Sequence, residues 1–177
     1  MKKFFIFLFI VSPCFANAQD QHLIPKEKWS KEFYIPDEFC AARGLHPGET
    51  NGLIRVWNGE SKKNGIMRLV DIRWYFNSPA EASEYLKRNM SELSESGDPV
   101  KTTIKIKDVP DLYVFSEGAG YRKLNETLGI SSYMYYFLFI VQNYVAKVFV
   151  STEKQIPVSE AAAFAQEAAK RLIAATR

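Results

Sequence analysis

The chain has 177 residues, with 23 Lys and Arg, 20 Asp and Glu, and a formal net charge of +3. This length suits one domain with a real hydrophobic core. The near balance of charges excludes the strongly basic surface of a nucleic-acid-binding protein, so we expect no nucleic-acid partner.

The first residues have the pattern of a secretory signal peptide. Two lysines precede an apolar stretch that ends at Val11, and the small residues Ala16 and Ala18 follow. This pattern predicts a signal peptide over residues 1–18, cut after Ala18, and a periplasmic or secreted protein. The apolar stretch is shorter than the roughly 20 residues that span a bilayer. Removing 18 of 177 residues leaves 159, and because both lysines leave with the peptide, the net charge falls to +1.

The mature chain divides into an irregular segment and one domain. Residues 19–52 carry three prolines and three glycines, which interrupt helices and strands, so we predict an irregular segment there. Residues 53–177 are predicted to form a single α+β domain. It opens with a β-hairpin of residues 53–57 and 66–76, which are rich in β-branched and aromatic side chains.

Two helices are predicted. Ser78 is a suitable N-cap, Pro79 follows at the first helical position, and Glu81 completes a capping box, so we expect a helix over about residues 79–95. The alanine-rich C-terminal stretch has early Glu and late Lys and Arg, which favours a second helix with Ser159 as its cap.

Three further segments are predicted as strands. Residues 100–107 alternate between lysine-rich and more apolar positions, and residues 112–118 are a shorter strand. The apolar run 133–150 is predicted to form a hairpin that turns at Gln142 and Asn143. As a membrane span this run would hold Lys147 near the bilayer centre, at about 2.5–3.5 kcal/mol. We therefore expect no integral membrane segment in the mature chain.

The order of these elements predicts an α+β fold: a single antiparallel sheet of about five to seven strands with two helices packed on one face. By this element order, residues 53–174 resemble the PsbP/Mog1-type fold of small exported or lipoprotein domains. The resemblance is architectural, and no residue motif carries over. It implies an adaptor, assembly or sensor role, since that fold serves all three.

The predicted hairpin has two apolar faces. The face of Phe137 and Phe139 has no charge and is expected beneath the helices, whereas the outer face is apolar with a basic rim that includes Lys101, Lys105 and Lys107. The outer face could be covered by residues 19–48, by an envelope protein partner or a second copy of the chain, or by a small amphiphilic ligand. The binding residues predicted on it are Met67, Leu69, Tyr75, Tyr136, Leu138 and Phe149.

No catalytic, cofactor or metal motif is evident in the sequence, so none is predicted. Cys40, the single cysteine after the signal peptide, precedes His46 by six residues, and the two could act as nucleophile and base. A lone cysteine is more often a small buried apolar residue. Asp108 and Asp111 flank a proline in a stretch that could hold a cation but reads better as a turn.

These observations predict an exported, non-enzymatic binding or assembly module. The alternative is a thiol-dependent enzyme whose site lies between the N-terminal segment and the sheet, with Cys40 and His46 as its reactive pair.

Overall fold

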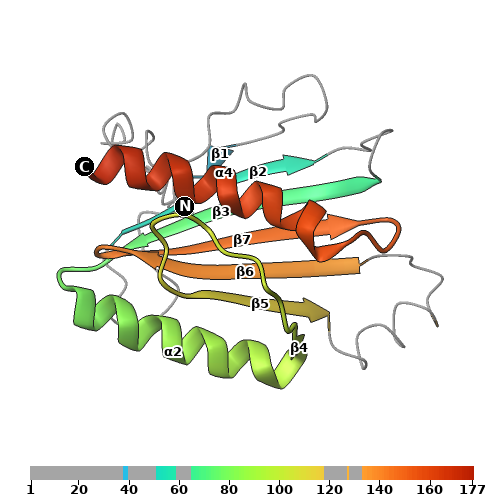
Figure 1. Cartoon of the computed structure of the whole chain (residues 1–177), viewed down its shortest axis with the longest axis horizontal. Helices are drawn as coiled ribbons and strands as arrows, with labels where there is room; N and C mark the ends of the chain where they lie inside the picture. The colour runs from blue at the N-terminus through green and yellow to red at the C-terminus, as the bar shows by residue number, and fades with distance from the viewer. Residues whose placement is uncertain (1–37, 40–50, 59–64, 118–126, 128–132) are drawn as a thin grey trace, which may run out of the picture.

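The computed structural model describes residues 38–39, 51–58, 65–117, 127 and 133–177. The predicted signal peptide, Cys40 and His46 lie outside these ranges. Seven antiparallel strands form one sheet in the order β1-β2-β3-β7-β6-β5-β4, accompanied by two long helices (Figure 1). The elements are β1 (Glu38–Phe39), β2 (Asn51–Asn58), β3 (Ile66–Tyr75), α2 (Pro79–Ser96), β4 (Gly97–Pro99), β5 (Leu112–Glu117), β6 (Tyr133–Val141), β7 (Tyr144–Thr152) and α4 (Val158–Thr176).

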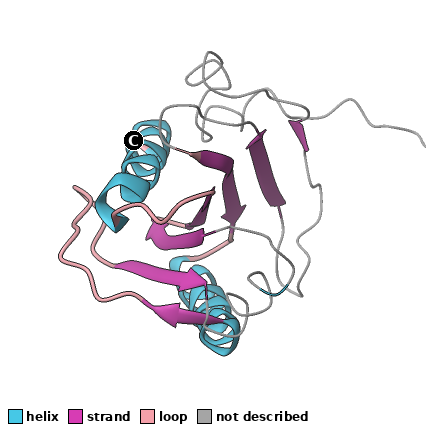
Figure 2. Cartoon of the chain, turned by 90° about the vertical axis from the view of Figure 1, so that its right-hand side faces the viewer, coloured by secondary structure: helices cyan, strands magenta, loops and turns pink. Residues whose placement is uncertain are grey.

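The predicted α+β class with one antiparallel sheet is confirmed, but the placement of both helices on one face is wrong. Helix α2 packs with Trp74, Leu138 and Val145 on one face of the sheet, which we call the α2 face. Helix α4 packs with Phe137 and Val148 on the other, the α4 face. Figure 2 shows the two helices on opposite sides of the strands. Both faces of the central strands are apolar, so each face is buried by a helix of its own.

The β6–β7 hairpin forms with the predicted turn. Val141 lies opposite Tyr144, and Phe137 lies opposite Val148. Gln142 has φ of 53°, the left-handed conformation that two-residue hairpin turns require. Among the helices in the described ranges, none combines the length and apolar character needed to cross a membrane.

Strand β3 presents its two faces opposite to the prediction. Alternation puts Val70 and Trp74 on the side of β3 opposite the predicted binding residue Leu69, and so predicts them beside Phe137. They lie instead opposite Phe149 and Val145 in β7 and belong to the α2 face. Leu69 lies opposite Val150 and belongs to the α4 face. Alternation along one strand shows which of its residues share a face, but the pairing register between strands decides which face that is.

The start of α2 is built as predicted, with one change. The Ser78 Oγ accepts a hydrogen bond from the Glu81 backbone N–H at 3.2 Å. The Glu81 carboxylate accepts in return from the backbone N–H of Asn77, also at 3.2 Å, instead of from Ser78. Ser159 is not the cap of α4. That helix begins at Val158, two residues earlier than a cap at Ser159 would place its start, and among the described residues no side chain caps it.

The strand predicted over residues 100–107 is absent from the described sheet, although its alternation of burial is real. After β4 this segment is held to the sheet edge by the Val100 N–H, which donates to the Val114 carbonyl at 2.8 Å. It then runs toward α4 and returns to the start of β5 (Figure 1). Ile106 and Val109 are buried in the core of the α4 face, while the alternate lysines are exposed. Burial beside a helix therefore explains the pattern that predicted a strand.

The predicted irregular range 19–52 also contributes to the sheet. Strand β1 pairs with β2, with Phe39 opposite Ile54, and β2 begins at Asn51. The sheet thus reaches into the chain upstream of the predicted domain start at residue 53.

Candidate functional site

The predicted binding residues do not form one surface. Leu69 is fully buried in the core of the α4 face, and Leu138 is fully buried in the core of the α2 face. Tyr75 is half-buried on the α4 face, where its ring lies 5.1 Å from that of Tyr144. Met67 lies in β3, and its side chain is outside the described part of the molecule. The separation follows from the β3 register, which moves Leu69 and Tyr75 to the face opposite Leu138.

Tyr136 and Phe149 do lie together, on the α2 face. Both side chains are half-buried, and their ring centroids are 5.1 Å apart. The Lys147 ammonium lies 5.4 Å from the Tyr136 ring centroid, within the range of a cation–π interaction. Desolvation lowers the pKa of Lys147, and the charge of Glu92 opposes this effect. The structure therefore brings together three residues from the predicted outer face. We call this group the aromatic strip: Tyr136, Lys147 and Phe149.

A buried ion pair lies on the α4 face. Asp71 and Arg73 are paired through the Asp71 carboxylate, and both side chains are almost fully shielded from solvent. The Arg73 guanidinium also donates to the Ile72 carbonyl at 2.7 Å and lies 5.8 Å from the Phe139 ring centroid. Desolvation lowers the pKa of Arg73, while the Asp71 carboxylate opposes this. Alternation along residues 66–76 predicts these two charges on the outer face, together with Leu69 and Tyr75.

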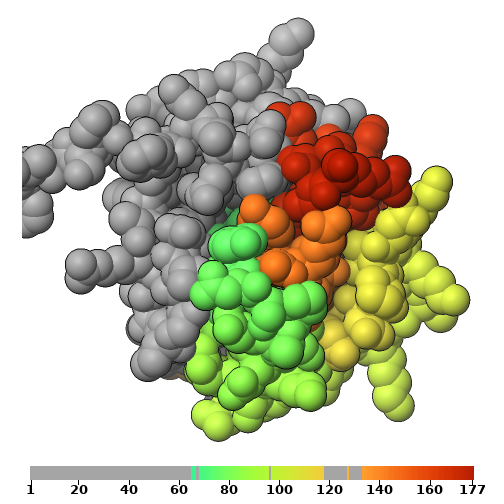
Figure 3. All heavy atoms as spheres, turned by 90° about the vertical axis from the view of Figure 1, so that its left-hand side faces the viewer, coloured from blue at the N-terminus to red at the C-terminus, as the bar shows by residue number. Residues whose placement is uncertain are grey.

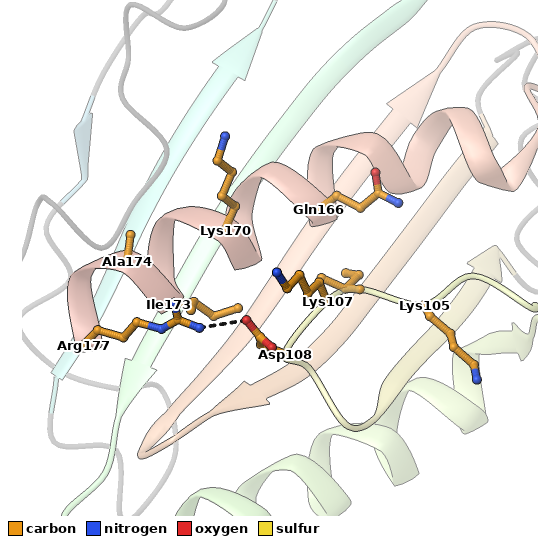
Figure 4. Close-up of a pocket in the computed structure, with 9 residues that line it drawn as sticks. Lys105, Lys107, Asp108, Gln166, Lys170, Ile173, Ala174 and Arg177 are labelled. Atoms are coloured by element: carbon orange, nitrogen blue, oxygen red, sulfur yellow. Dashed lines mark hydrogen bonds and ion pairs between the residues drawn. The ribbon is translucent and has the colours of Figure 1, made fainter.

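A pocket lies beside the C-terminal half of α4. We call it the α4 pocket. Its volume is about 570 Å³, and it opens between α4 and the segment of residues 105–108 (Figure 4). The residues that line it are Lys105, Ile106, Lys107, Asp108, Gln166, Lys170, Ile173, Ala174 and Arg177.

Local structure explains why the two walls of the α4 pocket meet. Asp108 has φ of 63°, and the Val109 N–H donates to the Ile106 carbonyl at 3.2 Å, so the chain reverses there. The end of α4 is tied to the β6–β7 turn because the Gln142 side chain donates to the Thr176 carbonyl at 3.0 Å. In Figure 3 the end of α4 (red) and the 100–111 segment (yellow) flank the β6–β7 turn (orange).

The α4 pocket has an apolar floor and a basic rim. Ile106 is buried and Ile173 half-buried, whereas the charged lining residues are exposed. An Arg177 Nη2 lies 2.8 Å from an Asp108 oxygen, and this pair closes one end. The Lys107 side chain extends along the gap toward α4, while Lys105 and Lys170 point outward on either side (Figure 4).

The second pocket is smaller, at about 290 Å³, and lies where the chain enters β6 and α4. Its lining includes Glu117, which is buried, and Tyr135, whose hydroxyl donates to the Ile156 carbonyl at 2.7 Å. Among the described residues, no group of three or more His, Cys, Asp and Glu is placed to hold a metal ion.

The sequence contained only part of the signal for the α4 pocket. Alternation indicated that Lys105 and Lys107 point outward, and the turn at Asp108 was expected. Arg177 lies 69 residues further on, and only the fold brings it to Asp108. Long-range contacts of this kind leave no spacing pattern in a single sequence.

Together these features describe an α+β domain in which a seven-stranded antiparallel sheet lies between two helices and a basic-rimmed pocket adjoins the C-terminal helix. No protein-family model matches the chain, and no curated protein matches it. The structure is similar to the crystal structure of the extracellular domain of PknH from Mycobacterium tuberculosis. The TM-score is 0.57 at 11% sequence identity, over 89% of this chain and 94% of that one. This likeness shows a common fold with a small extracellular domain, while the PsbP/Mog1 resemblance stays a prediction.

Proposed function

We propose that the chain is an exported, non-enzymatic binding module, periplasmic or secreted, and that the α4 pocket holds its ligand. The observation that carries this proposal is the pocket itself. Its volume of about 570 Å³ lies within the range typical of small-molecule sites, and an apolar floor with a few polar groups is their usual lining.

Two independent features support export. The N-terminal residues 1–18 have the pattern of a cleaved signal peptide. The solved domain that shares this fold is described as extracellular. A shared fold does not determine what is bound, so the ligand is argued from the pocket alone.

A neutral fluorescent probe tests whether the α4 pocket binds apolar molecules. N-phenyl-1-naphthylamine would be titrated into the exported protein and into two variants. Ala174→Trp adds an indole at the wall of the pocket, because Ala174 is an exposed lining residue on α4. Ala163→Trp is the matched control, since Ala163 is an exposed residue of α4 outside the pocket lining.

We expect saturable fluorescence with the wild type and Ala163→Trp, and loss of most of it with Ala174→Trp. Equal binding by both variants would place the probe elsewhere and contradict the proposed site. Absence of binding by the wild type would contradict the proposal that the pocket takes apolar ligands.

A second candidate function rests on the aromatic strip. Aromatic side chains are enriched at protein interfaces, and the two half-buried rings of the strip fit that pattern, although lysine is not enriched there. We propose the strip as the contact for an envelope protein partner or a second copy of the chain. Tyr136→Ser with Phe149→Ser should weaken self-association in sedimentation, or recovery of a crosslinked partner, while Ala174→Trp should not. The thiol-dependent enzyme stays the alternative prediction, with Cys40 and His46 outside the described residues.

A further inference from the structure

We infer that the ligand of the α4 pocket is a small anionic amphiphile: a carboxylate or phosphate head group on a short apolar tail. This inference rests on the proposed function of the pocket and adds the chemical class of the ligand.

The charges around the pocket select the head group. Four lining residues are basic and one is acidic, which gives a net charge of +3 at this one site. Without residues 1–18 the whole chain has a net charge of only +1, from 21 basic and 20 acidic residues, so positive charge is concentrated here. Such a cluster attracts anions and repels cations.

The geometry indicates which groups would meet the anion. The Lys107 ammonium lies along the gap between the two walls, and Arg177 reaches into the same end to meet Asp108 (Figure 4). The Asp108 and Arg177 side chains are 44% and 70% exposed, and ion pairs this exposed are weak. An incoming phosphate or carboxylate can therefore compete for the Arg177 guanidinium, which binds such groups through paired N–H donors.

The apolar floor of the pocket indicates that the tail of the ligand is apolar. Ile106 is buried, with 7% of its surface exposed, and Ile173 packs against the core of the α4 face. Ala174 adds another apolar contact at the wall. Apolar surface next to cationic side chains suits a ligand with both characters, because tail burial adds affinity that the screened charges alone do not give.

The experiment compares three soluble probes that share one tail, each kept monomeric. Octyl phosphate, octyl glucoside and octyltrimethylammonium would be titrated into the exported protein by calorimetry. We expect octyl phosphate to bind at least about tenfold more tightly than octyltrimethylammonium, since opposite charge is attracted and like charge repelled. Its affinity should also fall as salt is raised.

Matched lysine variants test whether the lysines at the pocket rim cause the preference for octyl phosphate. Lys105→Gln with Lys107→Gln removes two rim charges and should weaken octyl phosphate binding by about two- to fivefold per charge, as expected for exposed ion pairs. Lys87→Gln with Lys101→Gln removes two exposed charges outside the pocket lining and should leave it unchanged. All four positions are exposed, so neither pair of substitutions should unfold the protein.

Three results would overturn the inference. Equal affinity for the three probes, with N-phenyl-1-naphthylamine still displaced, would show an apolar pocket without charge selection and would leave the proposed function standing. Equal weakening by the two lysine pairs would show a general charge effect. Binding to vesicles of phosphatidylglycerol without binding to monomeric octyl phosphate would show that the site recognises a lipid surface instead of a free amphiphile.

Discussion

Phe137 and Leu138 are neighbours in β6, both are fully buried, and they point to opposite faces of the sheet. Phe137 lies in the core beneath α4, and Leu138 lies in the core with α2. The central strands therefore have no solvent-facing side at this position. Leu138 therefore cannot belong to an exposed binding surface. The candidate site lies instead beside α4, in the α4 pocket.

Truncation of either side chain should destabilise the protein. We expect Phe137→Ala to cost about 3–5 kcal/mol and Leu138→Ala about 2–5 kcal/mol, since both leave cavities in packed cores. Lys101→Ala, at an exposed position, should change stability by less than about 0.5 kcal/mol. Urea unfolding followed by circular dichroism measures all three. A Leu138→Ala variant as stable as Lys101→Ala would contradict burial of the α2 face.

Removing one member of the buried Asp71–Arg73 pair should destabilise the protein strongly, whereas replacing both residues by apolar ones should destabilise it much less. Arg73→Met removes the guanidinium that is ion-paired with the buried Asp71 carboxylate, and we expect a loss of about 3–5 kcal/mol, the usual cost of breaking a buried pair. The double variant Asp71→Leu with Arg73→Met removes both charges and should recover most of that loss. Chemical denaturation of the two variants is the measurement. A double variant less stable than Arg73→Met would show that the pair itself stabilises the fold.

Lys147 should give stability a specific pH dependence. Burial lowers its pKa in the folded state, so between that lowered value and the ordinary lysine value of about 10.4 the unfolded chain binds more protons than the folded one. The contribution of Lys147 to stability therefore rises with pH across this window. Lys147→Met lacks this contribution, so its stability relative to wild type should decline from neutral pH toward pH about 10.

Denaturation curves of wild type and Lys147→Met at several alkaline pH values test this difference. A stability difference that stays constant, or moves in favour of Lys147→Met as pH rises, would contradict the burial of the charge.

Export has a direct chemical signature. The signal peptide prediction requires the mature protein to begin at Gln19, after loss of residues 1–18. N-terminal sequencing or intact mass of protein recovered from the envelope fraction or the medium measures this. A protein that starts at Met1 and stays in the cytoplasm would contradict export.

Local signals predicted both helices and the β6–β7 hairpin, although they misplaced the cap of α4 at Ser159, and most other errors concerned the packing of distant elements. Ser78, Pro79 and Glu81 mark the start of α2 because capping is decided within one helical turn. Gln142 and Asn143 mark the hairpin turn because a long apolar run breaks there. The face of Leu69 depends on register with β7, which is set by contacts along the whole ladder.

The candidate site was less predictable for the same reason. Alternation along residues 100–107 predicts that the Lys107 side chain points toward solvent. It does not indicate the residues of α4 that line the same pocket, which follow more than fifty residues later in the sequence. Residues 100–107 pack beside α4 instead of pairing with a strand, which the alternation alone could not distinguish. Both features need the tertiary arrangement of α4 against the sheet.

The central claim is that the α4 pocket is a ligand site, and isoleucine methyl NMR tests it most directly. Ile106 and Ile173 line the pocket, whereas Ile72 and Ile140 pack on the α2 face and serve as internal controls. On titration with octyl phosphate, we predict saturable shifts of the Ile106 and Ile173 methyl signals while those of Ile72 and Ile140 stay in place. Saturable shifts confined to Ile72 and Ile140, or no saturable shift at either pair, would contradict it.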